Sequence, residues 1–102
     1  MNQLNIYLSN LEHNYKFLRR NLNSSTNLIA VVKASAYGSA LPAITKRLEK
    51  LGVNTFAVAY SNEGKILRKN GIKSRIMVFY PQPYGLDDII ENKLEACLYS
   101  VS

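Results

Sequence analysis

The stretch Leu28-Ile29-Ala30-Val31-Val32-Lys33 decides the fold of this chain. Its apolar run is too short for a helix and is typical of a strand buried on both faces, as strands of parallel sheets are. A polar segment over 21–26 precedes the run, and the run stops abruptly at the lysine. We therefore predict a strand over 28–32 that carries Lys33 at its carboxyl end.

Similar apolar runs recur along the chain and predict further strands. They lie at 56–60, 76–80 and 94–99. Between them the apolar residues follow helical spacing. This spacing predicts helices over 41–51, from Ser61 to before Gly71, and over 86–91. Pro42 suits the first turn of its helix, Gly52 suits a C-terminal cap, and Ser61 can cap the helix that it begins.

A further helix is predicted before the first strand. Leu11, Tyr15, Leu18 and Leu22 follow one another at helical spacing and form one apolar stripe. Ser9 and Glu12 have the spacing of a capping box, in which the two side chains satisfy free backbone N–H groups at the start of a helix. The sequence thus predicts a helix that begins near Ser9 and ends before the polar segment 21–26.

Strands that alternate with helices indicate an α/β fold with a parallel sheet. The short connections suit a (β/α) barrel, and they suit a doubly wound sheet nearly as well. Four strands cannot close an eight-stranded barrel. Residues 1–102 therefore stop midway through such a barrel, or they fold into something smaller than the pattern suggests.

Composition excludes several classes of protein. No apolar run approaches the roughly 20 residues that cross a bilayer, so we expect no membrane segment. The first residues do not have the pattern of a signal peptide, and Cys97 is the only cysteine, so no internal disulfide can form. One cysteine and one histidine make a metal site improbable, and we predict none. Together these features favour a cytoplasmic location.

The formal charge of +6 raises the question of nucleic-acid binding. The basic residues fall into groups, each on the expected outer face of a different helix. The groups are Lys16, Arg19 and Arg20; Lys46, Arg47 and Lys50; and Lys65, Arg68 and Lys69. They form no single stripe with interleaved aromatic residues, so solvated helix surfaces are the better interpretation and no nucleic-acid partner is expected.

The ends of the predicted strands carry the candidate functional residues, because parallel α/β folds place their sites at the carboxyl edge of the sheet. Lys33, Tyr60, Tyr80 and Tyr99 occupy these ends. The tyrosines suit an aromatic rim, although tyrosine suits many strand ends. The amine of a lysine that leaves an apolar strand can attack an aldehyde to form a Schiff base. The same position also suits a lysine whose charged end simply reaches solvent and has no functional role.

The segment Ala30-Val31-Val32-Lys33-Ala34-Ser35-Ala36-Tyr37-Gly38 resembles the cofactor-attachment segment of the alanine racemase family. His13-Asn14, Gly52-Val53, Glu63 and Gly71-Ile72 also match the family's N-terminal portion. The resemblance implies a pyridoxal-phosphate-dependent isomerase that interconverts L- and D-alanine for cell-wall synthesis. The segment departs from the family where Tyr-Gly-His-Gly is usual, because Ser39 and Ala40 follow Gly38 here.

The resemblance also implies roles for individual residues. Lys33 would be both the residue that attaches pyridoxal 5′-phosphate and a catalytic acid–base group at the substrate Cα. Tyr37 would bind the cofactor phosphate, and Val31 and Phe79 would lie near the cofactor ring. The family's second base is a tyrosine on a C-terminal β domain of the partner subunit, which lies outside this chain.

The resemblance thus implies that residues 1–102 form the N-terminal half of a (β/α)8, TIM-like barrel with parallel strands, with the rest of the barrel outside the chain. We expect them to be the N-terminal part of a pyridoxal-phosphate-binding barrel domain, inactive by itself, in a homodimer or larger homo-oligomer that acts on alanine. Two alternatives stay open. One is a pyridoxal-phosphate-binding carrier module without racemase activity, although the Tyr37-Gly38 pair favours the racemase. The other is a basic interaction domain without an enzymatic role.

Overall fold

The strands form one parallel sheet. The computed structural model describes residues 3–98, without the side chains at positions 3, 4, 6 and 35. Its strands are β1 (Ala30–Val31), β2 (Thr55–Val58), β3 (Arg75–Val78) and β4 (Glu95–Ala96), and they lie in the order β1-β2-β3-β4. Because consecutive strands are neighbours and the order does not reverse, the topology is that of a barrel rather than of a doubly wound sheet.

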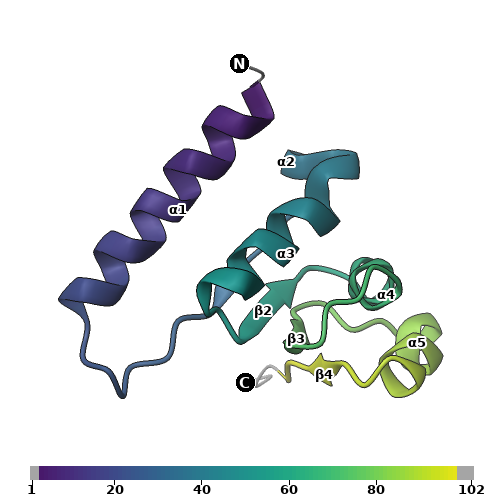
Figure 1. The fold of residues 1–102 in the computed structure, drawn as a ribbon. Helices are drawn as coiled ribbons and strands as arrows, with labels where there is room; N and C mark the ends of the chain where they lie inside the picture. The colour runs from purple at the N-terminus through teal and green to yellow at the C-terminus, as the bar shows by residue number, and fades with distance from the viewer. Residues whose placement is uncertain (1–2, 99–102) are drawn as a thin grey trace.

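Helices cover one side of this sheet. The four main ones are α1 (Gln3–Asn21), α3 (Leu41–Leu51), α4 (Ser61–Lys69) and α5 (Leu86–Glu91). The last three follow one another around the strands, and α1 runs along α3 at the outer edge (Figure 1). The predicted bounds of the helices over 41–51 and 86–91 are confirmed. Gly52 ends α3 with a φ of 116°, a conformation that glycine adopts without strain.

The start of the first helix was predicted wrongly. The helix α1 begins at Gln3, so Ser9 lies inside it and caps nothing. Glu12 does not reach back to the helix start, because its carboxylate pairs with Lys16 at 3.2 Å and with Arg47 of α3 at 2.6 Å. The first helix is therefore anchored by a contact with the second one, and the apparent capping box has no role.

The burial of the first strand also differs from the prediction. Val32 is buried in the core beneath the helices, but Ile29 and Val31 are 51% and 46% exposed on the other side of the strand. Only β2 is buried along its whole length. The helices thus cover one face of the sheet, and the opposite face is open at β1. The strands are also shorter than the apolar runs, and Tyr99 lies outside the described residues.

The covered face holds the hydrophobic core. Its buried members lie in β2 and β3, directly beside the ends of β1 and β4, on the inner sides of α3, α4 and α5, and in the loops that follow α3 and α4. They are Val32, Leu41, Ile44, Leu48, Val53, Phe56, Val58, Leu67, Ile72, Ile76, Val78, Ile89 and Leu94. Gly64 lets α4 approach this core closely, because a Cβ there would lie 2.8 Å from the Leu94 side chain. The core thus fixes the sheet from one side and leaves the strand ends free to form a site.

Two further side chains lie differently from the expectation. Arg68 is not on a solvated face: its guanidinium donates to the backbone carbonyls of Ile72, Ser74, Asn92 and Lys93, and so ties the end of α4 to the loops around β3 and β4. Ser61 is the first residue of α4, and the N-cap is Tyr60. None of the helices within residues 3–98 is long and apolar enough to cross a membrane.

Candidate functional site

Lys33 lies where the chain leaves the sheet. It follows β1 and is the N-cap of the short helix α2 (Ala34–Tyr37), with extended backbone angles of −120° and 118°. Its carbonyl oxygen accepts hydrogen bonds from the N–H groups of Ala36 and Tyr37, at 3.1 and 3.0 Å. The backbone of Lys33 is thus held from both sides, by the strand before it and by the helical turn after it, while its side chain is exposed.

A cleft of about 610 Å³ opens beside Lys33 at the carboxyl edge of the sheet. Its walls come from the ends of β1, β2 and β3 and from the start of α4. The lining residues are Val31, Lys33, Ala34, Ala59, Tyr60, Asn62, Glu63, Phe79 and Tyr80. The cleft therefore combines one primary amine with apolar and aromatic walls, which is the usual character of a small-molecule site.

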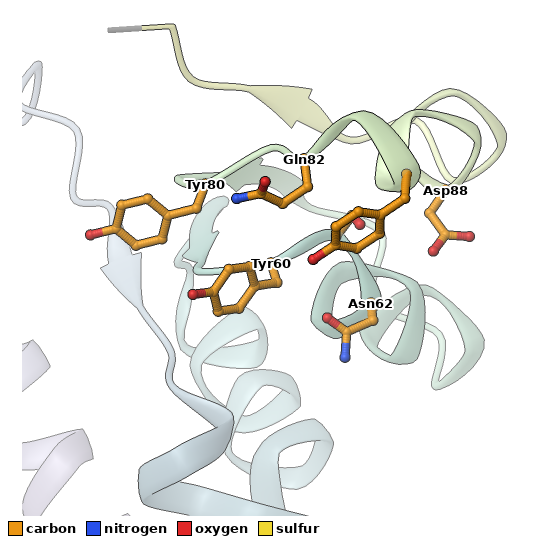
Figure 2. Close-up of a pocket in the computed structure, with 7 residues that line it drawn as sticks. Tyr60, Asn62, Tyr80, Gln82 and Asp88 are labelled. Atoms are coloured by element: carbon orange, nitrogen blue, oxygen red, sulfur yellow. The ribbon is translucent and has the colours of Figure 1, made fainter.

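Tyr60 and Tyr80 form the aromatic side of this cleft. Their ring centroids are 5.9 Å apart, and Figure 2 shows the two rings projecting side by side from neighbouring strand ends. They also border a second cleft, of about 710 Å³, which extends past Gln82 to Asp88 (Figure 2). The structure thus brings two of the three predicted rim tyrosines together with Lys33.

Tyr37 lies outside the Lys33 cleft. It lines an adjoining apolar groove between α1 and the sheet, and Val31 borders both the groove and the cleft. The hydroxyls of Tyr37 and of Tyr7 in α1 lie 2.9 Å apart and share a hydrogen bond. Burial, and then this hydrogen bond, raise the pKa of Tyr37 to about 12. A phenol with such a pKa keeps its proton near neutral pH and can donate it to an anionic oxygen.

Gly38 turns the chain away from this tyrosine. Its φ of 53° and ψ of −131° lie in a region that is open to glycine and strained for other residues. A glycine after Tyr37 therefore lets α2 end in a single turn. This explains the Tyr-Gly pair of the sequence in conformational terms.

Glu63 is a site residue whose role the sequence did not predict. Its side chain lines the Lys33 cleft but is only 7% exposed. One carboxylate oxygen accepts from the Tyr60 N–H at 2.8 Å, and the other accepts from the Ala34 N–H at 3.2 Å. A glutamate at the third helical position predicts the first bond. Only the fold brings Ala34 within reach.

The comparisons with known proteins agree with this architecture. The family model described as "Alanine racemase, N-terminal domain" matches residues 6–102. The chain belongs to the alanine racemase family. Its sheet is accordingly the N-terminal part of the family's (β/α)8 barrel, as predicted, and it superimposes on alanine racemase from Clostridium difficile 630 with a TM-score of 0.82 at 36% identity.

Related proteins are much longer than the chain. Alanine racemase 1 from Caldanaerobacter subterraneus subsp. tengcongensis is 33% identical over 97% of the chain, which covers 26% of that protein. An amino-acid racemase from Enterococcus faecalis is 40% identical over 93% of the chain, which covers 14% of that protein. The match to the Clostridium difficile structure covers 91% of this chain and 25% of that one. The chain therefore spans about a quarter or less of these relatives.

The residues of the site fit pyridoxal phosphate. An exposed lysine amine is the group that condenses with an aldehyde, and Val31, Ala59 and Phe79 offer apolar walls to a flat ring. Tyr37 supplies a protonated hydroxyl on the far side of Val31. Among residues 3–98 no three side chains of His, Cys, Asp or Glu gather closely enough to hold a metal ion.

The bond between the two tyrosines leads to a prediction for Tyr7→Phe. Removing the Tyr7 hydroxyl should lower the pKa of Tyr37 from about 12 towards the usual 10.0, and only part of the way, because burial is the larger cause of its shift. Tyrosine-labelled NMR of the full-length protein across pH 9–13 measures this, with Tyr37→Phe to assign the signal. An unchanged Tyr37 titration in Tyr7→Phe would mean that the two hydroxyls do not pair.

The same shift predicts how stability depends on pH. The folded chain holds the Tyr37 proton more tightly than the unfolded chain does. The stability that this contributes is therefore complete below pH 10.0, the unfolded value, and is lost as the pH rises to about 12. Tyr37→Phe should remove this dependence from denaturation curves recorded between pH 9 and 12. A slope that persists in Tyr37→Phe would assign it to another group.

Proposed function

We propose that the chain is the N-terminal part of the pyridoxal-phosphate-binding barrel domain of an amino-acid racemase that acts on alanine. One observation carries the proposal. Lys33, the lysine of the segment that resembles the family's cofactor-attachment segment, lines the cleft at the carboxyl edge of a barrel-type sheet. The relatives support the substrate class, because their names specify alanine, serine with alanine, or amino acids generally.

Lys33 carries the reactive amine in this proposal. Bound pyridoxal phosphate supplies an electron sink that stabilises negative charge at the substrate Cα. The ε-amine of Lys33 would hold the cofactor between turnovers and, when released from it, would remove a proton from the substrate Cα or return it there. The exposed side chain and the firmly held backbone suit both tasks, since the amine must move while its starting point stays fixed.

The surrounding residues bind and orient. Tyr37 would donate its hydroxyl hydrogen to the phosphate of a bound cofactor, and its raised pKa suits this role because the hydroxyl holds its proton. Val31 and Phe79, which line the cleft, would offer apolar contacts to the ring of a bound cofactor and would keep water from it. Racemisation also needs a proton donor on the opposite face of the Cα. By resemblance that group is a tyrosine of the partner subunit, so we propose a homodimer or larger homo-oligomer. We further propose that the enzyme acts in the cytoplasm and that its D-alanine serves cell-wall synthesis.

Covalent labelling tests the role of Lys33. Borohydride reduction of the full-length protein with bound cofactor should fix the cofactor to the peptide that contains Lys33. Lys33→Ala should lose both this label and the visible absorbance of the bound cofactor. Lys50→Ala, at the exposed end of α3, is the matched control and should keep both. A label on another lysine, with Lys33→Ala still coloured, would refute the proposal.

Visible absorbance together with a racemisation assay separates the alternatives. A basic interaction domain would bind no cofactor and would have no visible absorbance. A carrier module would be coloured but would leave L-alanine unchanged. Only a racemase should be coloured and also convert L-alanine into D-alanine.

Tyr37→Phe tests the contact with the phosphate. Hydrogen bonds to charged groups contribute about 1.5–3 kcal/mol, so the affinity for pyridoxal phosphate should fall by roughly tenfold to a hundredfold. Equilibrium dialysis of the full-length variant measures the loss. Tyr84→Phe is the control, because Tyr84 is 85% exposed and does not line the Lys33 cleft. Equal affinities in the two variants would leave Tyr37 only a packing role.

The open face of the sheet predicts the behaviour of a polypeptide of these 102 residues alone. Ile29, directly before β1, and Val31, in β1, are exposed, and the strand edges offer unpaired backbone groups. Covering apolar surface is worth about 25 cal/mol per Å², so association should overcome the repulsion between +6 charges. Light scattering should show dimers or larger species. A racemisation assay with added pyridoxal phosphate should show no conversion of alanine. A stable monomer, or turnover like that of an intact enzyme, would contradict this.

A further inference from the structure

The carboxylate of Glu63 joins two backbone segments that end at the same cleft. It lies in the first turn of α4, and each of its oxygens accepts a different N–H group. One belongs to Tyr60, directly before α4, and the other to Ala34, the residue after Lys33. Burial of the side chain to 7% exposure shields both bonds from water.

These bonds extend the pairing of β1 with β2 beyond the strand ends. In the sheet, the Val32 N–H donates to the Ala57 carbonyl at 2.9 Å. Two residues further along the chain, the Ala34 N–H donates to Glu63 instead of continuing this ladder into a regular strand. Lys33 thus lies between a bond to β2 and a bond to α4. Its Cα is held on both sides, and so is the direction in which its side chain leaves the backbone.

We propose that Glu63 is a positioning residue for Lys33. It does not touch the reacting atoms; it fixes the backbone on which the reactive amine is carried, through the Ala34 N–H group. The inference rests on the proposed function, because it assumes that Lys33 attaches the cofactor. A misplacement of about 1 Å at a reacting group can cost a hundredfold in rate, so a backbone anchor next to the lysine has a direct kinetic effect.

The arrangement requires a carboxylate rather than an amide. Both oxygens of Glu63 accept, so a glutamine would turn an NH2 group towards one of the two N–H donors. Glu49 provides a matched contrast. Its three hydrogen bonds, from the N–H groups of Lys73 and Ser74 and from the Ser74 hydroxyl, all go to one oxygen, Oε2. An amide oxygen can take over that position, so Glu49→Gln changes the charge without leaving an N–H donor opposed.

The test compares Glu63→Gln with Glu49→Gln in the full-length protein. With the cofactor removed, hydrogen exchange at the Ala34 amide should be about tenfold to a hundredfold faster in Glu63→Gln and unchanged in Glu49→Gln. After addition of pyridoxal phosphate, covalent capture at Lys33, trapped with borohydride, should slow by a similar factor in Glu63→Gln alone. The kcat for alanine should fall more than KM changes, because substrate-binding groups stay in place.

The outcomes distinguish this inference from the proposed function. Capture at Lys33 with equal rates and equal Ala34 exchange in all three proteins would overturn the inference and leave the proposed function intact. Capture at another lysine in the unmodified protein would overturn both. If Glu63→Gln does not fold, Glu63→Asp keeps both acceptors on a shorter stem. Faster Ala34 exchange and slower capture there support the inference, and unchanged rates overturn it.

Discussion

The site depends on the short parallel pairing between β1 and β2. Only two residue pairs define it, Ala30 with Phe56 and Val31 with Ala57. In contrast, β2 and β3 pair over their full lengths. This brief ladder nevertheless sets where the chain leaves the sheet. It therefore determines which cleft Lys33 faces and which elements stand around the amine.

Burial on one face of the sheet holds the ladder in place. The core residues of α3 and α4 pack against Val32, Phe56 and Val58, which are almost fully buried. The opposite side of β1 carries exposed apolar residues, and contact of such residues with water is energetically unfavourable. The same geometry leaves the carboxyl ends of the strands uncovered. The covered face thus supplies stability, and the uncovered strand ends supply the site.

The sequence predicts well what neighbouring residues determine. The bounds of α3 and α5 follow from local spacing, and Pro42 and Gly52 mark the two ends of α3. The parallel sheet follows from the alternation of strands and helices, whereas the choice between a barrel and a doubly wound sheet needs the strand order of the structure. The burial of β1 did not follow, because a single apolar run does not report which of its faces is covered.

Contacts between distant residues account for the other differences. Glu12 suggested a helix cap near Ser9, but its partner Arg47 lies 35 positions away. The partner of Tyr37 is 30 positions away, and the Glu63 contact with Ala34 spans 29. In each case the sequence marked the residue as a candidate for an interaction but did not reveal which distant residue is its partner. The candidate lysine could be identified from its segment, whereas the group that holds its backbone could not.

A crystal structure of the full-length protein with pyridoxal phosphate tests the central claim most directly. The claim is that this fold presents Lys33 to the cofactor from the end of β1. The account predicts continuous electron density between the Lys33 Nζ and the cofactor, and a Glu63 carboxylate bonded to the Ala34 N–H. A cofactor attached to a different lysine, or bound away from the cleft at the carboxyl edge of β1–β3, would contradict it.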